Sequence, residues 1–320
     1  MKILVRFLVT SIAATAFNAF AAEPYPTKPV RLVVGFAAGG PTDVLTRVAA
    51  QGMSERVGQQ FIVDNRTGAG GNIAAEHVAK AAPDGYTILV VVTAFVINPA
   101  LYSNLPFNFQ RDFVPVAGLA RFSYVMAVYS GLPVKTVAEL IAYAKANPGK
   151  VNFASAGVGG SNHLAVEIFK AMTGTDLVHV AYKGISAAYA DLVQGRVQLI
   201  VADRLSAAPH LQSGGLRPLA VTSTTRNEAM PNLPTVAETV PGYEASAFYG
   251  FAAPRGTPPD IVDKLSSTVN AVLSDPKTKA RFAELDATPL VFTPKEFTAF
   301  LARESERWGE AVRRAGVKGQ

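Results

Sequence analysis

The sequence predicts an α/β protein with two lobes, each built on a mostly parallel sheet flanked by helices. From Pro29 onward, short apolar runs rich in β-branched residues alternate with segments of helical periodicity, a pattern typical of parallel sheets. The chain has 320 residues, more than one hydrophobic core ordinarily serves, which favours two lobes. Two extended stretches, 114–128 and 245–253, are expected to cross between the lobes and form a hinge.

The apolar runs place the strands, and helices fill the gaps between them. The expected strands are 30–35, 61–65, 86–92, 151–155, 177–181 and 197–202. One helix begins at Pro41, a residue favoured in a first turn, and carries apolar side chains at helical spacing as far as Met53. A second apolar stripe begins after Ser161 and runs to Met172.

Capping residues mark the starts of four more helices, at Thr136, Thr257, Asp275 and Thr293. The helix after Thr293 has an apolar face that includes Trp308, the one tryptophan of the chain. Because its neighbours on that face are apolar, we expect Trp308 to pack in the core.

The first 21 residues have the features of a secretory signal peptide. Lys2 and Arg6 form a basic start, residues 7–20 are mostly apolar, and Ala19-Phe20-Ala21 is a small-x-small cleavage site. The apolar stretch is shorter than the ~20 residues that span a bilayer, and no cysteine follows it for lipid attachment. We therefore expect export and cleavage after Ala21.

Composition excludes several classes of protein. The chain has 30 basic and 24 acidic side chains, and no run of basic residues exceeds two, so we expect no nucleic-acid partner. The absence of cysteine excludes thiol catalysis, disulfides and zinc ribbons. The four histidines show no metal-ligand spacing, so no metal site is expected.

Three predicted strand-to-helix turns are rich in glycine and small polar residues: 35–43, 67–72 and 155–162. Glycine lets a ligand approach bare backbone, and the first N–H groups of the following helix have no intrahelical acceptor, so an oxyanion can bind there. Any one turn could serve only to reverse the chain, but three together favour an anion held between loops. The glycine spacing of dinucleotide and triphosphate sites is absent.

Some polar residues near these turns admit two interpretations. Asp203 follows an apolar run, at the end of a strand where α/β sheets bind ligands, but a helix N-cap is equally consistent. Asp43 complements the dipole of the first helix, and Lys183 is more simply a solvated cation than a Schiff-base lysine. Ser161 and His163 lie on different sides of a helical turn, which argues against a Ser/His hydrolase.

Taken in order, the motifs resemble those of the tripartite tricarboxylate transporter solute receptors, also called the Bug family. The matching segments are Phe36-x-x-Gly39-Gly40-Pro41-Thr42-Asp43, Gly68-Ala69-Gly70-Gly71-Asn72-Ile73-Ala74-Ala75, Gly159-Gly160-Ser161-x-His163-Leu164, Tyr182-Lys183-Gly184 and Leu233-Pro234-Thr235-Val236-x-Glu238. They extend over essentially the whole chain after the signal peptide. Each motif alone is weak, and the ordered set is specific.

The resemblance implies a periplasmic binding protein fold of the type II kind, which closes on its ligand. The first lobe would comprise residues 22–124 and 247–320, and the second lobe 125–246. It also implies a monomer without cofactor, metal or catalytic activity that binds a small organic carboxylate and delivers it to a two-component integral membrane carrier. A sensor for a signalling partner is the alternative, and a secreted hydrolase using Ser161, His163 and Asp203 is the second.

Carried over position by position, the resemblance also implies a set of ligand-binding residues. They are Phe36, Gly39, Gly40, Pro41, Thr42, Asp43, Thr93 and Ala94 in the first lobe and Ser155, Ala156, Gly157, Ser161 and Asp203 in the second. The first two glycine-rich loops would hold one carboxylate through ordered waters. Aliphatic mono-, di- and tricarboxylates, acidic amino acids and aromatic acids all remain open as ligands.

Overall fold

The structure is a computed structural model that describes residues 25–101, 105–227 and 230–315. The signal peptide expected at residues 1–21 lies outside the described residues. Among the helices described, none combines the length and the apolar character that crossing a membrane requires.

The first lobe is built on a mixed sheet. Strands β1 (Val30–Val34), β2 (Phe61–Asn65) and β3 (Thr87–Val92) run parallel in the order β2-β1-β3, and the longer β9 and β4 continue the sheet antiparallel. Strands β1 and β3 are almost entirely apolar and buried, because helices cover the sheet.

The second lobe has its own sheet, in the order β4-β7-β5-β6. Strands β5 (Val151–Ser155), β6 (Leu177–Ala181) and β7 (Leu199–Asp203) are parallel to one another, while β7 and β8 (Leu216–Val221) pair antiparallel with β4. The six strands expected from the apolar runs are confirmed to within two residues at either end.

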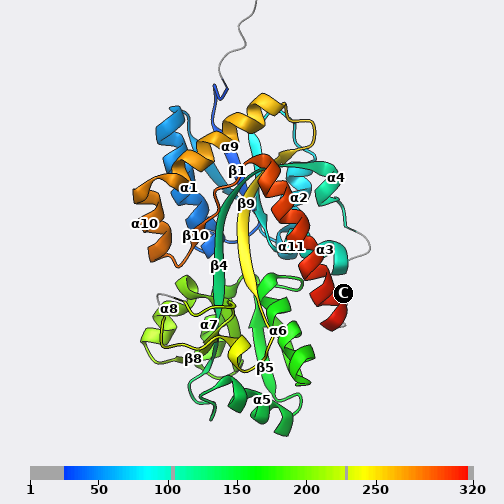
Figure 1. Cartoon of the computed structure of the whole chain (residues 1–320), viewed down its shortest axis with the longest axis vertical. Coiled ribbons are helices and arrows are strands. Elements are labelled where there is room, and N and C mark those ends of the chain that lie inside the picture. Colours follow the sequence, from blue (N-terminus) through cyan, green and yellow to red (C-terminus); the bar gives the residue numbers. More distant parts are fainter. Residues whose placement is uncertain (1–24, 102–104, 228–229, 316–320) are drawn as a thin grey trace, which may run out of the picture.

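The two long crossing segments are strands shared by both lobes. Strand β4 (Phe113–Tyr129) pairs with β9 (Ser246–Pro254) along residues 113–123, and its later part pairs with β7 and β8. Figure 1 shows β4 and β9 running side by side along the long axis, from one lobe into the other. The predicted fold class, two α/β lobes joined by two crossovers, is confirmed.

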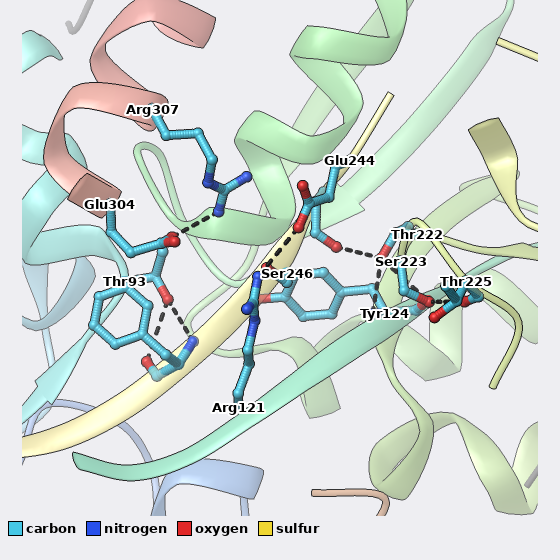
Figure 2. A network of polar contacts seen from close by, with 12 residues as sticks. Thr93, Arg121, Tyr124, Thr222, Ser223, Thr225, Glu244, Ser246, Glu304 and Arg307 are labelled. Carbon is cyan, nitrogen blue, oxygen red and sulfur yellow. Dashed lines mark hydrogen bonds and ion pairs between the residues drawn. The ribbon is translucent and has the colours of Figure 1, made fainter. Parts of the chain in front are cut away.

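Side chains tie the two crossings together where they enter the second lobe (Figure 2). The buried Thr222 Oγ1 accepts a hydrogen bond from the Tyr124 N–H (2.8 Å) and donates one to the Ala245 carbonyl (2.6 Å). Arg121 on β4 reaches Glu244, with 3.1 Å between Nη2 and Oε1. These contacts hold the two segments in register where they enter the second lobe.

Helices cover both faces of the sheets and complete the two lobes. They are α1 (Pro41–Val57), α2 (Asn72–Ala79), α3 (Ala94–Leu101), α4 (Phe109–Asp112), α5 (Val137–Ala146), α6 (Ser161–Thr173), α7 (Tyr189–Val193), α8 (Arg204–Gln212), α9 (Pro259–Ser274), α10 (Pro276–Glu284) and α11 (Pro294–Ala315). Short 3-10 turns are η1 (Ala69–Gly71), η2 (Ile185–Ala188) and η3 (Val236–Glu238), and β10 (Thr288–Pro289) is a two-residue edge strand.

Three of the four expected caps are confirmed. The side chains of Thr136 and Asp275 accept hydrogen bonds from the first turns of α5 and α10, and Thr293 and Glu296 bond each other reciprocally before α11. The prediction for Thr257 is wrong: its hydroxyl donates to a carbonyl three residues earlier, and α9 begins at residue 259 without a side-chain cap.

Helix α11 packs against both lobes, on α3 and β4 of the first and on α6 of the second. Trp308 on this helix is fully buried, which confirms its packing role. Figure 1 shows α11 descending from the first lobe toward α6.

Candidate ligand-binding site

The two lobes enclose a cavity of about 290 Å³ at the carboxyl ends of β1, β3, β5 and β7. This edge of an α/β sheet is where ligands ordinarily bind. The lining residues are Phe36, Ala37, Ala38, Gly40, Pro41, Thr42, Gly70, Val92, Thr93, Ala94, Phe122, Tyr124, Ala156, Gly157, Gly160, Ser161, Asn162, Lys183, Gly184, Ile185, Ser186, Ala187, Ala202, Asp203 and Tyr249.

The first-lobe loop between β1 and α1 presents a helix N-terminus to the cavity. Gly39 adopts φ 79°, and Pro41 occupies the first turn of α1. Since Pro41 has no N–H, the groups of Thr42 and Asp43 are the first helical donors, and neither has an acceptor within the helix. The loop thus offers backbone donors to an anion.

Asp43 holds this loop in place from behind. Its carboxylate accepts hydrogen bonds from the Gly39 N–H (2.9 Å), Arg47 Nε (2.9 Å) and Asn65 Nδ2 (3.0 Å). Burial opposes its ionisation, but the hydrogen bonds from Arg47, Gly39 and Asn65 outweigh burial and lower the pKa of Asp43. Asp43 is 2% exposed and does not line the cavity. Its negative charge is therefore compensated by these donors behind the cavity wall.

The second-lobe loop between β5 and α6 presents another helix N-terminus. Gly157, at φ 138°, donates its N–H to Ser155 Oγ (3.1 Å), and Gly159 donates to His163 Nδ1 (3.2 Å). Helix α6 then begins at Ser161, whose Oγ lies 2.5 Å from the hydroxyl of Tyr124.

The glycine-rich turn at residues 67–72, after β2, lies against the second lobe. Gly68, Gly70 and Gly71 all have positive φ, which other residues rarely adopt. A Cβ on Gly70 would lie 3.5 Å from the carbonyl oxygen of Val158 in the second lobe. The turn after β2 therefore faces the loop after β5 across the cleft.

Asp203 combines both roles that its position allowed. It ends β7 and lines the cavity, and it is also the N-cap of α8, accepting from the Ser206 N–H (2.8 Å) and hydroxyl (2.7 Å). Burial raises the pKa of Asp203, the bonds from Ser206 oppose that rise, and the Asp286 carboxylate adds to it.

The structure brings most of the predicted binding residues to this cavity. Those on its wall are Phe36, Gly40, Pro41, Thr42, Thr93, Ala94, Ala156, Gly157, Ser161 and Asp203. Gly39, Asp43 and Ser155 are not on the wall: they lie behind it and hold the two loops.

The cavity also has wall residues that the predicted ligand-binding set did not include. Phe122 and Tyr124 of β4 and Tyr249 of β9 form an aromatic wall, in which the Phe122 and Tyr249 ring centroids are 5.0 Å apart. The exposed Lys183 adds a cation at the turn before η2. The sequence signals were the aromatic residues of the two crossings and the Tyr182-Lys183-Gly184 motif.

The hydrolase constellation is not assembled. Ser161 Oγ bonds Tyr124 rather than a histidine, and the carboxylate of Asp203 is bound to Ser206. A serine side chain does contact a histidine ring elsewhere: Ser155 Oγ lies 2.6 Å from His179 Nε2, but Ser155 is fully buried. Residues 25–101, 105–227 and 230–315 contain no group of His, Cys, Asp or Glu arranged to hold a metal ion.

A two-lobed α/β fold with a cavity between the lobes, at the carboxyl ends of the strands, is the architecture of a solute-binding receptor. The sequence model described as "Tripartite tricarboxylate transporter family receptor" matches residues 45–317, so the chain belongs to this family. The family consists of substrate-binding receptors rather than enzymes, and its members are periplasmic binding proteins. The chain is 36% identical over 300 residues to protein BugT of Bordetella pertussis, covering 93% of this chain and 92% of BugT.

Solved structures with the same fold include carboxylate complexes. The structure of R. palustris Rpa4515 with adipate has a TM-score of 0.89 and 38% identity, covering 92% of this chain and all (100%) of the other. MatC (Rpa3494) from Rhodopseudomonas palustris with bound malate has a TM-score of 0.83 and 32% identity, covering 90% and 100%. The periplasmic binding protein BugD has a TM-score of 0.86 and 35% identity, covering 92% and 100%.

Proposed function

We propose that this chain captures a small organic carboxylate in the cavity between its lobes. The observation that carries the proposal is the convergence of two helix N-termini, α1 from the first lobe and α6 from the second, on one enclosed space. Each charge-assisted hydrogen bond contributes about 1.5–3 kcal/mol, so three or four are of the size that micromolar affinity requires, about 8 kcal/mol.

The remaining walls suit the hydrocarbon part of such an acid. Phe36, Phe122, Tyr249 and Ile185 are apolar or aromatic, and Lys183 supplies positive charge. Adipate and malate, which occupy two receptors of the same fold, are both small dicarboxylates, which supports this ligand class for the present chain.

The proposed ligand-binding set is the one expected from the motifs, with Gly39, Asp43 and Ser155 supporting the loops. We propose that residues 22–124 and 247–320 move as one lobe and 125–246 as the other, since β4 and β9 are shared by the two sheets. A cleft that closes on its ligand would exclude water from the carboxylate.

Export and delivery complete the proposal. We propose that the signal peptide is cleaved after Ala21, that the mature chain is a periplasmic monomer, and that it passes its ligand to a two-component integral membrane carrier. The family's membership in tripartite transporters supports the carrier.

Thermal unfolding against a panel of acids tests the ligand class. The mature protein is refolded to remove carried-over ligand and heated with succinate, malate, adipate, citrate, glutamate or benzoate. A hundredfold excess over Kd stabilises by about 2.7 kcal/mol, a shift of several degrees. A selective shift with the acid recovered unchanged supports the proposal, and no shift with any acid refutes it.

A matched pair of lysine variants tests the role of Lys183, the cation on the cavity wall. Lys183→Gln is expected to weaken binding of the preferred acid about threefold to tenfold by calorimetry, because it removes an attractive charge from the cavity wall. Lys145→Gln on α5, outside the cavity, removes an equal charge and is expected to leave affinity unchanged. Equal affinities for the two variants would exclude a role for Lys183.

A further inference from the structure

Asp286 is a first-lobe residue whose side chain is bound by the second lobe. It lies in the turn between α10 and β10, in the left-handed backbone conformation (φ 58°), which Asp and Asn tolerate better than most residues. Its side chain is 11% exposed. A carboxylate this buried requires partners.

Both partners of the carboxylate come from the second lobe. Arg204, the first residue of α8, places Nε 3.3 Å from Asp286 Oδ2, and Asn227 donates from Nδ2 to Oδ1 at 2.9 Å. Arg204 also donates from Nη2 to the carbonyl of Glu284 (3.4 Å), the last residue of α10. Three contacts thus join one turn of the first lobe to two elements of the second.

This cluster adjoins the ligand cavity. Arg204 directly follows Asp203, which lines the cavity and caps α8. Any movement that separates the lobes here must draw Arg204 and Asn227 away from Asp286. By contrast, the ion pairs Arg226–Glu238 and Arg281–Glu284 each lie within one lobe and are unaffected by such a movement.

We propose that Asp286, Arg204 and Asn227 form a latch that holds the lobes closed and thereby sets ligand affinity. The inference rests on the proposed function, since it assumes that closure and binding are coupled. A ligand that binds only the closed form has an apparent Kd inversely proportional to the closed fraction. Removing the latch lowers that fraction, so the apparent Kd rises although none of the three latch residues lines the cavity.

Asp286→Asn is the variant that tests the latch. It keeps the shape and the left-handed backbone preference but removes the charge that Arg204 pairs with. We expect the Kd for the adipate or malate probe, measured by calorimetry, to rise about tenfold. Arg204→Gln should raise it comparably, and the double variant should add little further, because both changes remove the same Arg204–Asp286 ion pair.

Glu284→Gln is the matched control. It removes an equal charge two residues away, from a side chain that is 63% exposed and pairs with Arg281 on the same helix. We expect wild-type affinity from this variant. A merely structural role for Asp286 would lower its unfolding temperature and leave the Kd unchanged, which would overturn the latch.

Solution scattering of the ligand-free protein provides a readout that needs no ligand. We expect a larger radius of gyration for Asp286→Asn and Arg204→Gln than for wild type and Glu284→Gln. Equal radii for all four proteins would overturn the latch even if acids bind. If no acid binds wild type, the carboxylate proposal fails, and the radii still decide the latch. If Asp286→Asn does not fold, Arg204→Gln decides both measurements.

Discussion

The hydroxyl of Thr222 joins the two crossing strands, and its removal gives a sharp prediction for stability (Figure 2). Thr222 is fully buried, accepts from the Tyr124 N–H at 2.8 Å and donates to the Ala245 carbonyl at 2.6 Å. Thr222→Val keeps the shape of the side chain but leaves both backbone groups without these partners.

The size of the effect follows from the cost of buried groups that lose their hydrogen bonds. Each such group costs about 1–3 kcal/mol, so the loss of two partners is expected to lower the unfolding free energy by about 2–6 kcal/mol. For a protein of this size, whose unfolding entropy is about 0.6 kcal/mol/K, that corresponds to a fall in the unfolding midpoint of roughly 3–10 °C.

Urea and thermal unfolding of the ligand-free protein measure this loss. Thr222→Ser retains the hydroxyl and is expected to keep most of the stability. Ser223→Ala removes a neighbouring exposed hydroxyl, which donates to the Thr225 carbonyl at 2.7 Å, and is expected to cost less than about 0.5 kcal/mol. A Thr222→Val protein within 0.5 kcal/mol of wild type, on the order of measurement error, would refute the reasoning.

Two further predictions concern acid stability and core packing. Burial lowers the pKa of His163 to about 3 and that of His179 to about 4, so both are neutral when folded and protonate near pH 6.5 when unfolded. Stability should therefore be full above pH 6.5 and fall as pH drops toward 4. The more buried His163 contributes up to about 1.4 kcal/mol per pH unit, and the half-exposed His179 contributes less because solvent screens it. Equal urea midpoints at pH 7 and 5.5 would contradict this. Gly250→Ala would place a Cβ 2.1 Å from Phe297 Cζ and should cost about 1–3 kcal/mol in thermal unfolding, whereas Gly309→Ala, whose Cβ meets nothing closer than 3.4 Å, should be neutral or stabilising. Similar midpoints for the two glycine variants would show that the core accommodates the Gly250 methyl group.

The strands were predictable because their composition is extreme. β1 and β3 are short, buried and rich in β-branched residues, and turns flank them on either side. β8 was not foreseen, because Pro218 interrupts it and proline lowers the expectation of a strand. β10 is only two residues long and carries no periodic signal.

The glycine-rich turns could be recognised in the sequence. Which of their residues line the cavity and which support the loops could not be predicted. Asp43 belongs to a motif beside the cavity, yet its carboxylate faces Arg47 and Asn65. Tyr249 and Phe122 meet in the cavity although they are far apart in the chain, because β4 and β9 pair antiparallel. Contacts of this kind depend on strand register, which a single sequence does not specify.

The latch could not be predicted from the sequence, because its residues meet only through packing between distant elements. Asp286 follows α10, Arg204 begins α8, and Asn227 lies after β8, with no motif linking them. Only the packing of one lobe on the other brings them together.

A crystal structure of the mature protein with its preferred acid tests the central claim most directly. The account predicts a carboxylate between the lobes, with oxygens within hydrogen-bond reach, directly or through one water, of backbone N–H groups in the first turns of both α1 and α6. An acid bound outside the cavity, or inside it without contact to either helix N-terminus, would contradict the account.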